Sequence, residues 1–87
     1  MVSAKLLTQE QIDELVEIAR GDPVFWEAMK DRETNQLNDD GSAKIPSMSM
    51  LVDDLVKRKY GQDHIFDIGS LIVQLRSHIL KDLGQIT

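Results

Sequence analysis

The sequence predicts an all-α fold, a small four-helix domain packed around a long C-terminal helix. Residues that start and stop helices recur along the chain, and the apolar residues between them repeat every three or four positions. A chain of 87 residues buries only about 60–65% of its unfolded surface, which supports one hydrophobic core. We therefore expect a single helical domain over residues 1–87.

Local signals set the boundaries of the first two helices. Thr8 and Gln11 form a capping-box pattern that begins the first helix, and Gly21 ends it. Asp22 as N-cap and Pro23 in the first turn begin the second helix at once. The predicted helices cover residues 9–20, 23–30, 48–60 and 65–83, and a long loop covers residues 31–47.

The second helix and the loop after it differ sharply in composition. Phe25 and Trp26 concentrate aromatic mass in the helix, where such residues usually anchor a core. The loop carries turn-forming residues at 38–41, and a short strand or hairpin within residues 31–46 is an alternative to irregular structure. A loop this long in so small a domain is either functional or mobile.

The third helix has an N-cap in Ser47 or Ser49 and ends at Tyr60-Gly61. Its last turn holds the basic cluster of the chain, Lys57-Arg58-Lys59. Cations at a helix C-terminus are favoured by the helix dipole, which accounts for this cluster without any ligand.

The last helix carries two apolar lines. One line faces the core and consists of Ile65, Ile68, Leu71, Ile72, Leu75, Ile79 and Leu83. The second line recurs every seven residues, with Gly69 and Arg76 lying between the two; it consists of Phe66, Val73 and Leu80. Either Phe25, Trp26 and the long loop bury this second line, or a partner covers it.

Several classes of function find no support in the sequence. Without cysteine the chain has no disulfide and no thiolate metal site, and His64 and His78 are too far apart on a helix to share a metal. We expect both histidines at the surface or its rim. The loop over 36–47 resembles a calcium-binding EF-hand loop only in part, because Gln36 and Ser47 replace its first and last carboxylates. We predict no cofactor, no metal site and no enzymatic activity.

Compartment and charge follow from composition. The N-terminal segment is not a secretion signal, and no apolar run reaches the roughly 18 residues of a membrane span, so we expect a cytoplasmic protein without membrane contact. The net charge of the chain is −5, and its acidity is concentrated in residues 1–40, which hold ten acidic residues against four basic ones. Four of these carboxylates form an acidic strip on the first helix, either a solvated face or a docking surface for a basic partner: Glu10, Asp13, Glu14 and Glu17.

These observations favour a small acidic protein–protein interaction module: an adaptor, an inhibitor or a regulatory subunit of the kind common among bacterial and phage-encoded regulators. The expected partner is another protein, or a second copy of the chain in a homodimer. The predicted partner-binding residues are Phe66, Gly69, Val73, Arg76 and Leu80.

The alternative is a DNA-binding transcriptional regulator. The third and fourth helices would form a helix-turn-helix, and the stretch LRSHILKDLGQI loosely resembles the recognition-helix end of winged-helix regulators. The outward face of that helix carries residue types that read bases or contact phosphate. The residues of this alternative site are Lys57, Arg58, Lys59, Ser70, Gln74 and Lys81.

Overall fold

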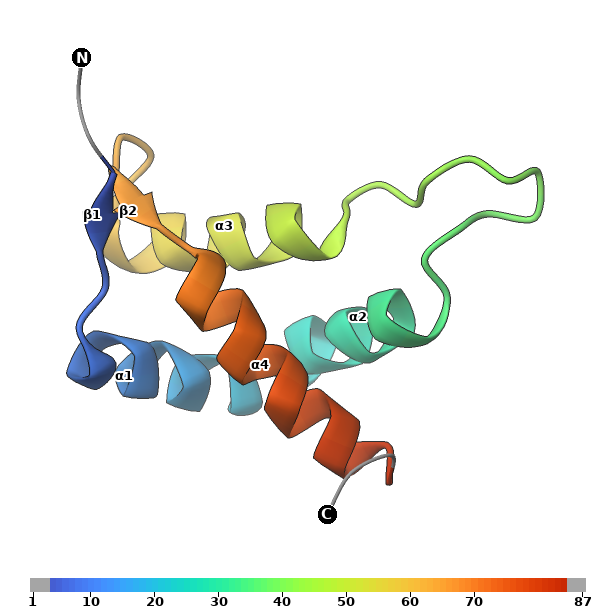
Figure 1. Cartoon of the computed structure of the whole chain (residues 1–87), viewed down its shortest axis with the longest axis horizontal. Coiled ribbons are helices and arrows are strands. Elements are labelled where there is room, and N and C mark those ends of the chain that lie inside the picture. The colour runs from blue at the N-terminus through green and yellow to red at the C-terminus, as the bar shows by residue number, and fades with distance from the viewer. Residues whose placement is uncertain (1–3, 85–87) are drawn as a thin grey trace.

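The computed structural model describes residues 4–84, and the all-α prediction is confirmed (Figure 1). The elements in chain order are β1 (Lys5–Leu6), α1 (Gln9–Arg20), α2 (Pro23–Thr34), α3 (Met48–Tyr60), β2 (Phe66–Asp67) and α4 (Gly69–Asp82). The observed bounds of α1 and α3 are those that the sequence predicts.

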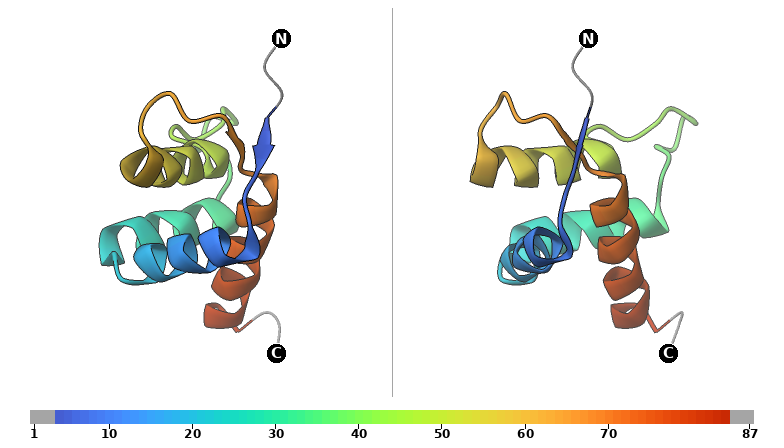
Figure 2. Two further views of the ribbon diagram at one scale, coloured as in Figure 1. Left: turned by 90° about the vertical axis from the view of Figure 1, so that its left-hand side faces the viewer. Right: turned by 60° about the vertical axis from the view of Figure 1, so that its left-hand side comes forward.

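The four helices surround one hydrophobic core. Every helix contacts each of the other three, and α4 crosses α1, α2 and α3 rather than running alongside them (Figures 1 and 2). The core consists of Leu7, Ile12, Leu15, Val16, Ala19, Phe25, Trp26, Met29, Val52, Leu55, Val56, Leu71, Leu75 and Ile79. The expected anchoring role of the two aromatic residues is therefore confirmed, and the indole Nε1 of Trp26 donates to Oδ2 of Asp82 at 2.7 Å.

The predicted helix caps are present. The Thr8 hydroxyl accepts from the Gln11 amide at 3.1 Å while the Gln11 side chain accepts from the Thr8 amide at 2.9 Å, which completes the capping box. Asp22 accepts from the amide of Phe25, and Ser47, not Ser49, accepts from the amide of Met50. These caps satisfy helix-end N–H groups by local contacts, which is why sequence spacing locates them.

Helix α2 extends to Thr34, beyond the predicted end at Lys30. Tertiary contacts hold the extra turn. Nε of Arg32 donates to the carbonyl oxygen of Pro46 at 2.6 Å, and Glu33 binds Arg76 of α4. Neither partner is near in sequence, so the periodicity of the helix alone gave too early an end.

The prediction of one unbroken helix over residues 65–83 is wrong at its start. Residues Phe66 and Asp67 form β2, and α4 begins at Gly69. Three hydrogen bonds replace helical ones: His64 Nδ1 accepts from the Phe66 amide, Asp67 Oδ1 accepts from the Gly69 amide, and the Lys5 amide donates to the carbonyl of Ile65. Side chains that bind nearby backbone amides compete with helix formation, and glycine in a helix interior is unfavourable.

Strand β2 pairs with β1 in parallel, with Lys5 opposite Phe66 and Leu6 opposite Asp67. This pair joins the start of the described chain to the segment before α4, as Figure 1 shows at the N-terminal end of the fold. It therefore fixes where α4 begins relative to α1.

The loop between α2 and α3 contains a short hairpin, as one of the sequence alternatives proposed. A single antiparallel bridge joins Leu37 and Ala43, and Asp40 accepts hydrogen bonds from the amide and hydroxyl of Ser42. Gly41 takes a positive φ of 87° in the turn, a conformation that glycine adopts without strain. The loop projects away from the helices in Figure 1.

Candidate functional site

One side of α4 is left uncovered by the rest of the chain. At about 100° per residue, the predicted residues on this helix fall within about 60° of one another; we call them the α4 stripe, and they are Gly69, Val73, Arg76 and Leu80. Val73 is 67% exposed, and Leu80 is half-buried without packing against the core. The alternative that Phe25, Trp26 and the long loop bury the second line is therefore wrong for Val73, whereas Leu80 is partly covered.

Phe66, the fifth predicted residue, does not belong to this stripe. It lies in β2, half-buried, with its ring centroid 4.9 Å from that of Tyr60 at the end of α3. The seven-residue spacing that grouped it with Val73 and Leu80 assumed a helix through Phe66, and the helix starts later. Its place in a partner-binding surface remains a prediction that rests on its partial exposure alone.

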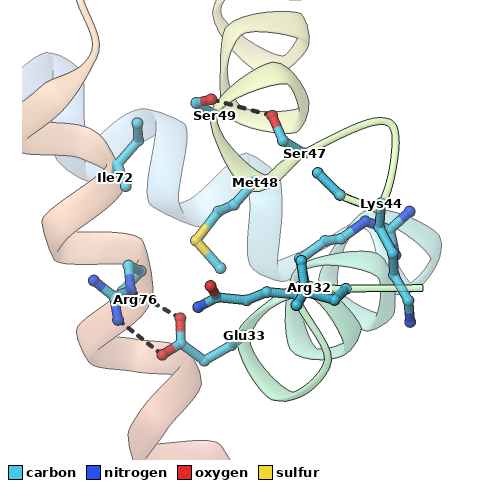
Figure 3. Close-up of a pocket in the computed structure, with 11 residues that line it drawn as sticks. Arg32, Glu33, Lys44, Ser47, Met48, Ser49, Ile72 and Arg76 are labelled. Atoms are coloured by element: carbon cyan, nitrogen blue, oxygen red, sulfur yellow. Dashed lines mark hydrogen bonds and ion pairs between the residues drawn. The ribbon is translucent and has the colours of Figure 1, made fainter. Parts of the chain in front are cut away.

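A hollow of about 440 Å³ borders the stripe, where the C-terminal turn of α2, the loop, the start of α3 and the middle of α4 meet (Figure 3). We call it the α2–α4 hollow. Met48 extends its thioether into the centre of the hollow, toward Arg76 (Figure 3). The lining residues are Arg32, Glu33, Gln36, Leu37, Ala43, Lys44, Ser47, Met48, Ser49, Ile72 and Arg76.

An ion pair forms one wall of the hollow. Nε and Nη2 of Arg76 donate to the two carboxylate oxygens of Glu33 at 2.8 Å and 2.9 Å, a bidentate arrangement. The Glu33 side chain is 8% exposed and that of Arg76 is 46% exposed. The hydrogen bond from Arg76 holds the pKa of Glu33 below its ordinary value despite burial, which acts in the opposite direction. The pair thus fastens the end of α2 to the stripe.

Arg32 and Lys44 line another part of the hollow, and Asp31 lies outside it. Asp31 binds both Arg32 and Lys44, with Nζ of Lys44 at 3.2 Å. The hydrogen bond from Lys44 is the main cause of a lowered pKa of Asp31. Arg32 also reaches the Pro46 carbonyl, so this group ties α2 to the loop next to the first turn of α3.

His64 is half-buried, as expected for a rim residue, although its side chain is almost fully covered. Its side chain is 6% exposed, its Nε2 lies 2.8 Å from Oδ1 of Asp53 in α3, and its Nδ1 accepts from the Phe66 amide at 3.1 Å. Because Nδ1 accepts from an amide, the proton lies on Nε2, which donates to Asp53. His64 therefore joins β2 to α3 and has a structural role. His78 is half-buried, as expected for a rim residue, and its Nδ1 is 3.1 Å from Nη1 of Arg20.

The three residues of the basic cluster, which belong to the alternative DNA-binding site, contact carboxylates of the same chain. Lys57 binds Asp53 at 2.9 Å, Arg58 binds Asp22 at 3.0 Å, and Lys59 binds Glu14. Each cation of the basic cluster therefore has a carboxylate partner within the fold. The hydrogen bond that Lys57 donates to Asp53 raises the pKa of Lys57, and the hydrogen bond that Lys59 donates to Glu14 raises the pKa of Lys59.

The other three residues of that alternative site lie on one face of α4 and differ in their contacts. Gln74, expected on an outward face, exchanges side-chain hydrogen bonds with Gln9 of α1 at 3.0 Å and 3.1 Å, whereas Ser70 and Lys81 are exposed. The connection over residues 61–68 contains β2 and is longer than the roughly three- or four-residue turn of a helix-turn-helix. The DNA-binding hypothesis thus gains no support from the arrangement of these residues.

The acidic strip is exposed along α1, as its helical spacing predicts. Glu14 is bound to Lys59, and Asp13 accepts from Nε2 of Gln9. The remaining two members, Glu10 and Glu17, make no ion pair with any residue between positions 4 and 84. As a docking surface the strip stays a prediction.

Within residues 4–84 no group of three or more histidine, aspartate and glutamate side chains is arranged to hold a metal ion. None of the helices in that range is both long and apolar enough to cross a membrane.

A second hollow of about 450 Å³ lies between α2 and α3, with Phe25 and Leu51 in its wall and the exposed Val24 at its edge.

The chain matches no protein-family model, no curated protein sequence and no solved structure.

Sequence reasoning found Arg76 and missed most of the α2–α4 hollow. Glu33 and Arg32 lie beyond the predicted end of α2, and Leu37 and Lys44 lie in a loop without periodicity. One feature of the sequence could have indicated the ion pair. Arg76 is a cation in a largely apolar helix, and a charged residue that is partly buried usually has a partner of opposite charge.

Proposed function

We propose that the protein is a small protein–protein interaction module, an adaptor, inhibitor or regulatory subunit, that binds its partner through the α4 stripe and the α2–α4 hollow. The observation that carries the proposal is the exposure of Val73 on the central helix of the fold. Helix α4 contacts all three other helices through its core-facing side. An apolar residue on the opposite side, such as Val73, therefore contributes nothing to the core of the chain.

The stripe and the hollow support each other as parts of one surface. Arg76 belongs to both, and the exposed Leu37 and half-buried Ile72 continue the apolar area beyond it. Binding energy at protein interfaces concentrates in a few apolar and arginine side chains placed in a concave centre with a polar rim. The Glu33 pair holds Arg76 in one orientation, which lowers the entropy that binding would otherwise cost.

Photocrosslinking tests this surface directly. A benzophenone amino acid is placed at Val73 and, as the matched control, at Lys81, which is also exposed on α4 but on another side of the helix. In cells of the native host we expect a discrete crosslinked product from position 73 and none from position 81. The same products from both positions, or none from position 73, contradict the proposal.

Sedimentation of the purified protein separates the two kinds of partner. If position 73 crosslinks to a second copy of the chain, the protein should sediment as a dimer at micromolar concentration. If it crosslinks to a different protein, the isolated chain should sediment as a monomer. A monomer that also yields no crosslink leaves the surface without a partner and refutes the function.

A further inference from the structure

The charge of the α2–α4 hollow is opposite in sign to that of the chain. The chain carries −5, yet the hollow and its adjoining ion pairs combine three cations, Arg32, Lys44 and Arg76, with two carboxylates, Asp31 and Glu33. The hollow is thus a locally positive site on an acidic protein. Local charge of one sign in a concave site attracts groups of the other sign.

The guanidinium groups retain hydrogen-bonding capacity in spite of their ion pairs. Arg76 directs Nε and Nη2 to Glu33, and Arg32 directs Nε to Pro46 and Nη1 to Asp31. Each guanidinium has five N–H groups, and neither Nη1 of Arg76 nor Nη2 of Arg32 donates to another residue between positions 4 and 84. These free donors match the geometry of a carboxylate.

The centre of the hollow has a different character from its rim. Met48, Ile72 and Leu37 supply apolar surface, and the flexible Met48 thioether occupies the middle (Figure 3). Methionine adapts its shape to different apolar partners. The hollow therefore suits a large apolar side chain with an anionic group beside it.

We infer that the α2–α4 hollow binds an acidic amphipathic segment of a partner protein, in which a large apolar side chain contacts Met48 and a flanking carboxylate contacts Arg76 or Arg32. This inference rests on the proposed function and adds the chemistry of the partner. We favour a peptide over a nucleic acid because the apolar centre of the hollow suits a side chain, and because the net charge of −5 on the chain repels a polyphosphate.

Peptide selection tests the partner chemistry. A library of short random peptides displayed on phage is selected against the wild-type protein. The hollow is then blocked by Ser49→Trp at its rim, and Ser70→Trp is the control. Both serines are exposed second residues of a helix, and only Ser49 lines the hollow. Circular dichroism and thermal unfolding establish that both variants fold.

We expect enrichment of peptides that combine a large apolar residue with aspartate or glutamate, and we expect Ser49→Trp but not Ser70→Trp to abolish their binding. A synthetic copy of the enriched peptide with its carboxylates changed to amides should bind about three- to tenfold more weakly, as one or two partly exposed ion pairs predict. Failure of enrichment, enrichment of basic or uncharged peptides, or equal binding to both tryptophan variants overturns the inference.

The two proposals fail in different ways. If position 73 crosslinks a partner while the peptide selection fails, the interaction function stands and the assigned partner chemistry is wrong. If a dimer forms and Ser49→Trp alone dissociates it, the occupant of the hollow is a second copy of the chain, which also overturns the acidic-segment inference. If position 73 crosslinks nothing, the function itself is refuted.

Discussion

The two sides of α4 are built from similar residues and have different surroundings. On one side Leu71, Leu75 and Ile79 are fully buried against the other three helices. On the other side Val73 lies in solvent and Leu80 is half-buried, with Arg76 between them bound to Glu33. The apolar spacing therefore identifies the side that forms the core, but it does not tell whether the rest of the chain also covers the second side.

The difference shows that the neighbouring elements decide whether an apolar residue in a small domain is buried in the core or exposed at the surface. The first side has three helices to pack against, whereas the second side has only the edge of α2 and the loop, which projects away. Substitutions on the two sides should separate stability from binding.

The largest effect is expected at Leu75. Leu75→Ala removes a fully buried side chain from the centre of the core, so the free energy of unfolding should fall by about 2–5 kcal/mol in urea denaturation. Val73→Ala is the matched control on the opposite side and should change the free energy of unfolding by less than about 0.5 kcal/mol. Similar losses for both variants would mean that the second side is also buried.

The ion pair at the border of the two sides should have an intermediate effect. Arg76→Ala leaves the Glu33 carboxylate, 8% exposed, without its partner, and the free energy of unfolding should fall by about 1–3 kcal/mol. The double variant Arg76→Ala with Glu33→Gln should recover part of this loss, because no unpaired charge remains. Lys81→Ala serves as control; a loss equal to that of Arg76→Ala would argue against a specific role for the pair.

Acid should weaken the ion pair between Glu33 and Arg76 and so lower the stability of the fold. The pKa of Glu33 lies below its ordinary value of 4.5 in the folded protein, so its ion pair stabilises the fold above that pH. This stabilisation is lost as the pH falls from about 4.5 through the folded-state pKa, and unfolding midpoints measured across that range should drop. Glu33→Gln should flatten the drop, whereas Asp39→Asn in the exposed loop should leave it unchanged. A wild-type curve matched by Glu33→Gln would show that the pair does not contribute.

The smallest effect on stability and the largest on binding are expected at Val73. Val73→Asp introduces a charge at an exposed position and should change the free energy of unfolding by less than about 0.5 kcal/mol. It should weaken binding of the crosslinked partner about tenfold or more, because the new carboxylate would lose its hydration at a position where the wild-type protein presents an apolar side chain. Unchanged affinity in a titration of the purified partner would exclude Val73 from the interface.

The sequence predicted those parts of the fold that depend on neighbours within a few residues. Thr8, Asp22 and Ser47 each cap the helix that follows, and the apolar periodicity of α1 and α3 gave their bounds and buried faces. Such contacts require only the spacing of residues along the chain. Of the candidate site, the same reasoning found the stripe residues on α4.

The errors lie where distant segments meet. Residues 65–68 lie in the stretch that predicts a helix, yet pairing with Lys5 and the hydrogen bonds of His64 and Asp67 keep them out of α4 and place Phe66 and Asp67 in β2. The last turn of α2 exists because Pro46 and Arg76 bind it. The sequence did not predict the α2–α4 hollow, because its walls come from four segments that are separate in the sequence.

The sequence by itself thus determined an all-α domain with one core and an acidic N-terminal half, because helix propensity, capping and burial of apolar faces act over short stretches of chain. Only the tertiary structure decided whether the second side of α4 is covered, where that helix begins, and that Arg32, Lys44 and Arg76 gather around one hollow. Those outcomes depend on the packing of residues far apart in the chain, and local spacing carries no information about which of them meet.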